Sequence, residues 1–116
     1  MILPIYLYGS EVLRRENVDV DLNDKEGIAT LLENMWETLA NADGCGLAAP
    51  QVGVNKNLVI VDGRELSDSY DYLHDFVRVM INPVVLEESE ETCEYSECCL
   101  SVPGIYAEVT RPSKIK

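Results

Sequence analysis

The sequence predicts an α+β fold in which one long amphipathic helix packs on a mostly antiparallel sheet. Apolar residues recur at three- and four-residue spacing across 24–42, the pattern of a helix with one buried face. Two β-branched runs, 58–61 and 77–82, are too short for helices and predict strands. From 105 to 110 apolar and polar residues alternate, as in a strand with one buried face. We expect one domain spanning 1–116.

The long helix carries signals for its start and its stop. Asn23 followed by Glu26 predicts a capping box, and Leu22 is placed for a hydrophobic staple. Gly44 is predicted to end the helix. A shorter helix is expected over 9–15, where a serine precedes an acidic first turn and a basic last turn.

The remaining segments predict loops and further sheet. The polar, aromatic stretch 63–76 predicts an exposed loop, and 87–91 a solvated acidic turn. Residues 84–86 are predicted to extend the sheet, and 113–116 resemble the opening of another strand. Because a sheet that stops in mid-strand leaves backbone groups and an apolar face uncovered, we expect the chain to be a truncated part of a longer domain.

Composition narrows the class of protein. Acidic residues outnumber basic ones by 21 to 9, and the resulting charge of −12 repels phosphate backbones, which argues against nucleic acid as a partner. No apolar run approaches the roughly 20 residues of a membrane helix, and no signal peptide is recognisable. We therefore expect a soluble, cytoplasmic protein without a membrane partner, whose four cysteines are reduced thiols or a metal ligand.

The octapeptide GCGLAAPQ at 44–51 is the first segment suited to chemistry. Its glycines let the backbone approach a ligand, Pro50 stiffens the turn, and Gln51 offers an amide donor. Taken alone, its first three residues are equally typical of a helix cap followed by a flexible turn.

A second segment, ECCLS at 97–101, places two cysteines side by side. Taken alone it is also consistent with a buried strand that carries two hydrophobic thiols. On an extended backbone Cys98 and Cys99 point to opposite faces, so we expect that they cannot both serve one site. Cys45 and Cys93 are interpreted as packing residues.

In this order and spacing, the two segments resemble two of the three signature motifs of peptide deformylases, and the resemblance runs from about residue 5 to 116. It implies that Cys99 is the metal thiolate. It also implies that Gln51 and the Leu100 backbone N–H stabilise the developing oxyanion. The residues that would line the substrate cleft are Gly44, Cys45, Gly46, Glu97, Cys98 and Tyr106.

Two positions leave questions open within the resemblance. The family pattern is Glu-Gly-Cys-Leu-Ser, so Cys98 stands where glycine is usual, and its side chain is expected to crowd the cleft or to shift the backbone. Arg111 is placed to pair with Asp43 or Glu97, or to be an ordinary surface arginine.

The resemblance implies metal-dependent removal of the formyl group from the formyl-methionine of nascent peptides. The implied cofactor is Fe²⁺, with Zn²⁺ or Ni²⁺ as substitutes, held by one cysteine and by two histidines of a His-Glu-x-x-His helix whose glutamate moves the proton. This chain has one histidine, His74, which we interpret as a surface residue. We expect the metal site to be incomplete, the chain alone to be inactive, and the uncovered sheet to self-associate.

Two other classes of function stay open. One is a non-catalytic module, or degenerate homologue, that binds a peptide terminus without hydrolysing it. The other is a metal-binding protein that uses Cys98, Cys99 and acidic residues. Metal analysis separates the second from the rest, and peptide titration separates the first from an enzyme.

Overall fold

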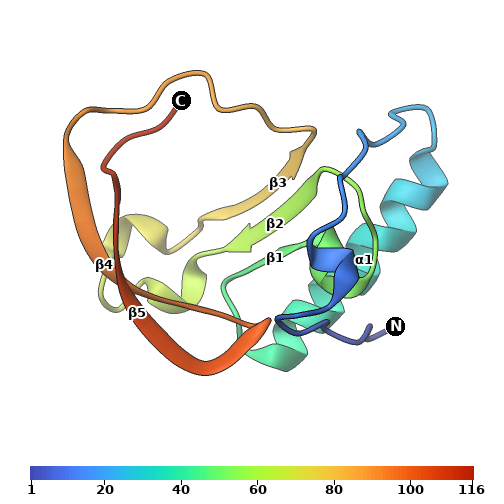
Figure 1. Cartoon of the computed structure of the whole chain (residues 1–116), viewed down its shortest axis with the longest axis horizontal. Helices are drawn as coiled ribbons and strands as arrows, with labels where there is room; N and C mark the ends of the chain where they lie inside the picture. The colour runs from blue at the N-terminus through green and yellow to red at the C-terminus, as the bar shows by residue number, and fades with distance from the viewer.

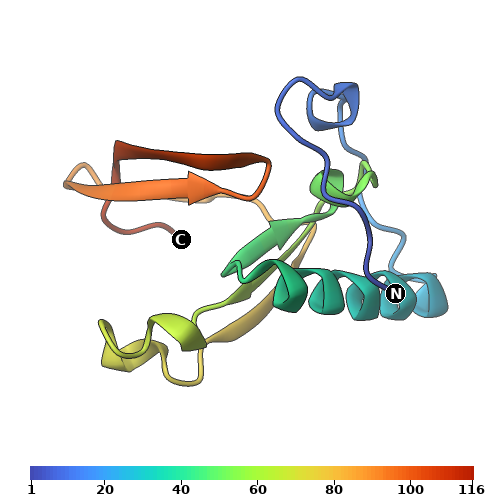
Figure 2. The same ribbon diagram turned by 90° about the horizontal axis from the view of Figure 1, so that it is seen from below.

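The computed structural model describes residues 1–116 and has the predicted α+β architecture. One α-helix, α1 (Lys25–Ala42), packs on a three-stranded antiparallel sheet of order β1-β2-β3 (Figure 1). A separate antiparallel hairpin is formed by β4 and β5, and in Figure 2 this hairpin and α1 lie on different sides of the three-stranded sheet. The strands are β1 (Gly46–Ala48), β2 (Leu58–Asp62), β3 (Val77–Ile81), β4 (Thr92–Cys99) and β5 (Val102–Pro112).

Four short 3₁₀ helices occupy connecting segments. In η1 (Glu11–Leu13) the short helix predicted near the N-terminus makes a single turn, and η2 (Ala49–Val52) follows β1 directly. The predicted loop between β2 and β3 contains η3 (Arg64–Leu66) and η4 (Asp71–Leu73). None of the helices is both long and apolar enough to cross a membrane.

The start of α1 differs from the prediction by one residue. Asp24 is the N-cap, and its carboxylate accepts a hydrogen bond from the Gly27 N–H at 3.1 Å. The predicted capping box of Asn23 and Glu26 is wrong, because the Asn23 N–H is bonded to the Asp21 carboxylate at 3.0 Å in the preceding turn. Asp24 therefore takes the position nearest the free N–H groups of the first turn.

The two residues that follow α1, Asp43 and Gly44, have different roles. Asp43, and not Gly44, adopts the left-handed conformation, with φ of 55°, and its N–H reaches the Leu39 carbonyl. Gly44 has a packing role instead, because a Cβ at this position would lie 2.8 Å from Leu100 Cδ1. The glycine therefore lets the first motif approach the second.

The core lies between α1 and the three-stranded sheet. In β2 the side chains of Leu58 and Ile60 are both buried, and Leu47 of β1 pairs with Ile60. Alternation along β2 directs these residues toward the helix. The buried cluster consists of Val20, Met35, Leu39, Leu47, Ala49, Val52, Leu58 and Ile60. Since Leu47 and Ala49 belong to it, the first motif is anchored in the core.

The hairpin of β4 and β5 has no buried residue in either strand. Its register runs from Thr92 opposite Pro112 to Cys98 opposite Tyr106, and it then shifts so that Cys99 pairs with Val102. The residues between Val102 and Tyr106 are left without partners on β4. The hairpin thus carries an irregularity at the second motif.

The predicted extension of the sheet at 84–86 is wrong. Asn82 has a positive φ of 51° and Pro83 lacks a backbone donor, so the chain leaves the sheet at this point. Instead of a strand at 113–116, the structure has one isolated bridge between Glu88 and Ile115.

Candidate functional site

Gln51 is held at both ends of its amide group. It lies in η2, and its Oε1 accepts a hydrogen bond from the Ala48 N–H at 3.0 Å. Its Nε2 lies 3.1 Å from Ser101 Oγ and 3.6 Å from Cys99 Sγ. Because the oxygen is already engaged with a donor, the amino group must face the second motif. The amide donor is therefore oriented before any ligand arrives.

The second motif is held against the first by Leu100. Its half-buried side chain packs on the core cluster, next to Leu39 and Gly44. Cys99, immediately before it, is an exposed free thiol at the end of β4. The packing of Leu100 thus positions both the Cys99 thiol and the Leu100 main chain relative to Gln51.

Ser101 is part of this arrangement, and sequence reasoning assigned it no role. It is 4% exposed, its carbonyl accepts a hydrogen bond from the Tyr8 N–H at 2.7 Å, and its hydroxyl lies beside Gln51 Nε2. In the sequence, the feature that could have indicated a role for Ser101 is a small hydroxyl residue within the cysteine motif. Tyr8, by contrast, gave no local signal, because its contribution is a backbone N–H.

Glu97 and Arg111 form a two-point ion pair across the hairpin. Arg111 Nε and an NH₂ group lie 2.6 and 2.7 Å from the two carboxylate oxygens of Glu97. These hydrogen bonds hold the pKa of Glu97 below its ordinary value. Of the partners considered for Arg111, the structure selects Glu97 and leaves Asp43 apart. The Glu97 carboxylate therefore ties β4 to β5 near Cys99.

The other predicted cleft residues come from both sides of the site. Gly46 is the first residue of β1 and pairs with Val61, while Tyr106 is 71% exposed and pairs with Cys98. The pKa of Tyr95 is raised, first by a hydrogen bond with Tyr70 and less by burial and by the thiols of Cys45 and Cys98. Gly46 and Tyr106 thus come from the two separate sheets that carry the first and the second motif.

His74 contacts only residues of its own loop. Its ring nitrogens lie 3.0 Å from the Asp71 carbonyl and 3.9 Å from the Asp75 carboxylate, and the side chain is 73% exposed. No group of three or more His, Cys, Asp or Glu side chains in the chain is arranged to hold a metal ion. Catalytic zinc-type sites use three protein ligands, so the single Cys99 thiol does not by itself fit a resident metal.

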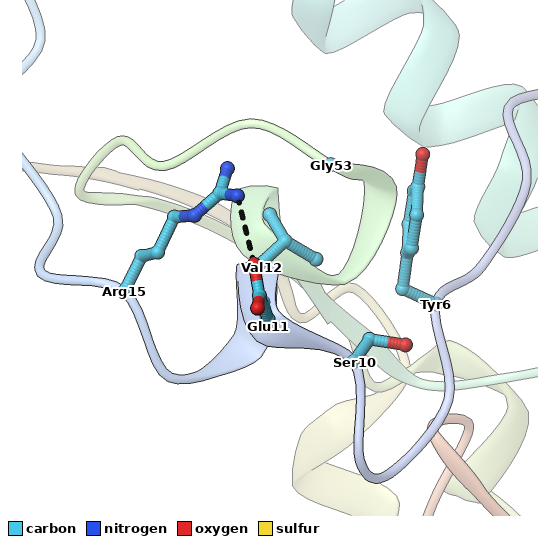
Figure 3. A pocket seen from close by; sticks show the side chains of 6 residues that line it. All are labelled: Tyr6, Ser10, Glu11, Val12, Arg15 and Gly53. Atoms are coloured by element: carbon cyan, nitrogen blue, oxygen red, sulfur yellow. Dashed lines mark hydrogen bonds and ion pairs between the residues drawn. The ribbon is translucent and has the colours of Figure 1, made fainter.

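Two cavities differ in their relation to the site. One of about 360 Å³ is bordered by Gly53, the residue that follows η2, and contains none of the predicted site residues (Figure 3). An ion pair of 3.3 Å between Arg15 and Glu11 borders it. It is lined by Tyr6, Ser10, Glu11, Val12, Arg15 and Gly53.

The other cavity, of about 200 Å³, lies on the hairpin and is bordered by Cys98 and Cys99 together. The register of the hairpin shifts between these two residues, and the expectation that their side chains serve different sites stays a prediction. The full lining is Glu97, Cys98, Cys99, Val102, Ile105 and Ala107.

The profile of the polypeptide deformylase family matches residues 2–116. A peptide deformylase of Salinibacter ruber is 46% identical over 120 residues, which cover 100% of this chain and 61% of that protein. One of Christiangramia forsetii is 39% identical over 122 residues, covering 99% of this chain and 62% of that protein. The chain therefore belongs to the polypeptide deformylase family, a family of metallohydrolases. It spans about three fifths of the length of these curated relatives.

Solved structures agree on the fold. A class I type b peptide deformylase from Acinetobacter baumannii superposes with a TM-score of 0.89 at 32% identity, covering 99% of this chain and 73% of that one. The peptide deformylase of Thermotoga maritima gives 0.85 at 34% identity, with 99% and 71% covered. A further A. baumannii structure, with Met-Ala-Ser bound, gives 0.87 at 32% identity, with 99% and 74% covered. The predicted family and fold class are confirmed.

Proposed function

We propose that the protein is a peptide deformylase that hydrolyses the N-terminal formyl group from formyl-methionyl nascent peptides. The observation that carries the proposal is the position of Gln51, whose amide is fixed by the Ala48 N–H and aimed at Cys99. Hydrolysis of a formyl amide places negative charge on the carbonyl oxygen in the transition state. A donor that is already oriented toward that charge stabilises it without reorganisation.

Three groups of this chain have roles in the proposed reaction. Gln51 Nε2 and the Leu100 backbone N–H donate hydrogen bonds to the developing oxyanion, and Cys99 supplies one thiolate ligand for the metal. The peptide lies along the edge of β1, which pairs on one side only. Main-chain groups near Cys45 and Gly46 are then available to an extended peptide, as in strand addition.

Fe²⁺, with Zn²⁺ or Ni²⁺ as substitutes, is the metal that we propose for the whole protein, on the family resemblance. The 116 residues contribute one sulfur donor and no second histidine. A single donor does not define a catalytic coordination geometry. We therefore propose that these residues alone release no formate, and that Gln51, Cys99 and Leu100 act when the remaining ligands are supplied.

The experiment compares the chain with a fusion to the unmatched remainder of the S. ruber relative. The chain alone, supplied with Fe²⁺ and formyl-Met-Ala-Ser under reducing, anaerobic conditions, is expected to release no formate, and the fusion is expected to release it. In the fusion, Gln51→Met should lower kcat by about 10²–10³, because it removes an oxyanion donor.

Asn34→Leu in the same fusion is the matched control, because it removes an amide from α1 outside the site. It should leave kcat unchanged. Turnover by the chain alone in the presence of a strong chelator would show that the division of roles is incorrect. So would full activity of the Gln51→Met fusion.

A peptide-terminus-binding module is the second candidate, and the unpaired strand edges favour it. Both β1 and β4 have one edge without a partner strand. Such edges accept an extended peptide through main-chain hydrogen bonds. Calorimetric titration of the chain with Met-Ala-Ser and with its formylated form tests this candidate. Binding of both peptides without formate release, in the chain and in the fusion alike, would favour it over the enzyme.

We also propose that the chain self-associates and that the protein is cytoplasmic. Support for self-association comes from large apolar side chains on and after β3 that are at least 40% exposed, namely Val79, Met80, Val84, Val85 and Leu86. Burial of such surface contributes about 25 cal/mol per Å². Sedimentation velocity should show dimers or larger species whose fraction rises with concentration. A monomer throughout would contradict the proposal.

A further inference from the structure

Residues 6–8, here called the N-terminal clamp, donate backbone hydrogen bonds to both motifs of the site. The Tyr6 N–H donates to the Gln51 carbonyl at 2.8 Å, and the Tyr8 N–H donates to the Ser101 carbonyl at 2.7 Å. In Figure 1 this part of the chain passes the end of the β4–β5 hairpin. Two donors that are two residues apart thus reach two acceptors that are 50 residues apart in the sequence. The clamp therefore ties the first motif to the second.

The side chains of Gln51 and Ser101 complete a ring of hydrogen bonds with the clamp. Gln51 Nε2 donates to Ser101 Oγ at 3.1 Å, while Gln51 Oε1 accepts from the Ala48 N–H at 3.0 Å. Because Ser101 is only 4% exposed, water competes little for its hydroxyl. A primary amide has two N–H groups, and Ser101 accepts from one of them. The other is left for the side on which Cys99 Sγ lies, 3.6 Å from Nε2.

Contacts with the packed region hold the clamp itself in place. Leu3 packs against the core, and its N–H donates to Thr38 Oγ1 at 2.9 Å, on a residue that is 1% exposed. Gly53 has a φ of 89°, and a Cβ at this position would lie 2.9 Å from Tyr6 Cε2. Tyr6 and Gly53 border the same cavity (Figure 3). The missing side chain at Gly53 therefore lets the Tyr6 ring lie against the residue that ends η2.

We propose that Tyr8 and Ser101 are positioning residues for the Gln51 amide. The Tyr8 N–H fixes the main chain of Ser101, and Ser101 Oγ then fixes the rotation of the amide, so that its second N–H faces the oxyanion. Tyr6 holds the clamp to the main chain of Gln51 itself. The consequence for turnover rests on the proposed function, whereas the orientation of the amide does not.

The first experiment measures the orientation without any turnover. Gln51 is the only glutamine of the 116-residue chain, so glutamine labelled with ¹⁵N in its side chain gives the amide signal of this residue alone. Tyr8→Pro removes the backbone N–H, whereas Tyr8→Ala removes the ring and keeps the N–H. Hydrogen exchange of the Gln51 side-chain amide should be about fivefold faster in Tyr8→Pro, the factor that corresponds to one net hydrogen bond. Tyr8→Ala should exchange at the rate of the unchanged chain.

Ser101→Ala tests the second step, because it removes the acceptor and keeps the carbonyl to which Tyr8 donates. It should speed the exchange to a similar extent. Ser96→Ala, which removes an exposed hydroxyl from β4, is its matched control and should leave the rate unchanged.

Far-UV circular dichroism shows whether Tyr8→Pro folds. If it does not, replacement of Tyr8 by its α-hydroxy acid removes the N–H and keeps the ring. An unchanged exchange rate in the folded Tyr8 variant, or in Ser101→Ala, would overturn the proposal.

The fusion described above measures the consequence for turnover. The folded Tyr8 variant and Ser101→Ala should each lower kcat by about tenfold and leave KM unchanged, a smaller loss than removal of the donor itself. In the Gln51→Met fusion they should lower kcat no further, because the amide through which they act is absent. Equal losses in both backgrounds would overturn the proposal. An inactive unchanged fusion would instead refute the proposed function, and the exchange rates would still decide how the amide is held.

Discussion

The helix and three-stranded sheet differ sharply in burial from the β4–β5 hairpin. The first region contains the eight-residue core cluster, with Met35, Leu47 and Ile60 at most 1% exposed. The hairpin strands contain no buried residue at all. Gln51 belongs to the first region and Cys99 to the second. The site therefore combines the Gln51 amide donor, which lies next to the packed core, with the Cys99 thiol, which is held mainly by the backbone pairing of β4 with β5.

The contacts between the two regions consequently determine the geometry of the site. Leu100 packs beside Gly44, and Gln51 Nε2 lies 3.1 Å from Ser101 Oγ. The Tyr8 N–H donates to the Ser101 carbonyl at 2.7 Å. These contacts all fall on the turn after β4. We therefore expect substitutions in the rest of the hairpin to lower stability less than substitutions in the core.

The largest expected effect is on the packed region. Ile60→Ala should lower the free energy of unfolding by about 2–5 kcal/mol, because it leaves a cavity in the core. Ile105→Ala, at a position 60% exposed on the hairpin, should change it by no more than about 0.5 kcal/mol. Urea titration followed by circular dichroism measures both. Equal losses would show that the hairpin is packed as firmly as the sheet.

Gly44→Ala should have the next largest effect, because it acts on the contact between the regions. The new Cβ would lie 2.8 Å from Leu100 Cδ1 and 3.1 Å from Leu39 Cδ1. Leu39 is 2% exposed and cannot move aside, so Leu100 must shift. The cost should be about 1–3 kcal/mol in the free energy of unfolding, as for overpacking.

Faster alkylation of Cys99 should accompany this loss, as the turn moves away from Gln51. Gly46→Ala is the matched control, since its nearest neighbour is the Ile60 carbonyl at 3.5 Å, an ordinary contact. It should leave the alkylation rate unchanged. A Gly44→Ala chain with unchanged stability and unchanged Cys99 reactivity would count against Leu100 as the link.

A smaller effect is expected from the Glu97–Arg111 ion pair, because both side chains are substantially exposed. Arg111 lowers the pKa of Glu97 in the folded chain. The stabilisation is therefore fully present above the unfolded pKa, about 4.3, and is lost as the pH falls through the lower folded pKa. The stability difference between the unchanged chain and Glu97→Gln should thus shrink on acidification.

Amide hydrogen exchange measures the effect of Glu97→Gln on each of the two regions separately. Glu97→Gln should speed exchange along β4 and leave β2 unchanged. Asp62→Asn is the control, because it removes the Asp62–Arg64 ion pair of the packed region, in which Arg64 lowers the pKa of Asp62. Exchange in β4 should not respond to it. Faster exchange in β2 after Glu97→Gln would contradict the separation.

The smallest expected effect concerns Tyr95. Tyr70→Phe should lower the pKa of Tyr95 toward its ordinary value, because the hydrogen bond with Tyr70 is the first cause of its increase. A pH titration of tyrosine ring signals by NMR measures this change. Tyr72→Phe, which removes the hydroxyl from the ring paired with Tyr70, should leave the pKa of Tyr95 unchanged. An unaltered Tyr95 titration in Tyr70→Phe would show that the hydrogen bond between Tyr70 in the loop and Tyr95 in the hairpin does not raise the pKa of Tyr95.

Local patterns in the sequence determined the family, the long helix and the strands at 58–61 and 77–82. Helical and strand periodicities report burial directly, because each face of an element either packs or meets water. The two motifs likewise pointed to Gln51 and Cys99, which the structure brings to 3.6 Å. These inferences needed no knowledge of which segments meet.

Only the tertiary structure decided which groups pair. It paired Arg111 with Glu97 and brought the Ser101 hydroxyl to 3.1 Å from Gln51 Nε2. It also assigned the helix cap to Asp43 and left Gly44 to admit Leu100. Each outcome depends on a register or a contact between distant segments. Such contacts cannot be read from a periodic pattern in the sequence, because they depend on how distant segments pack and not on the spacing of residues along the chain.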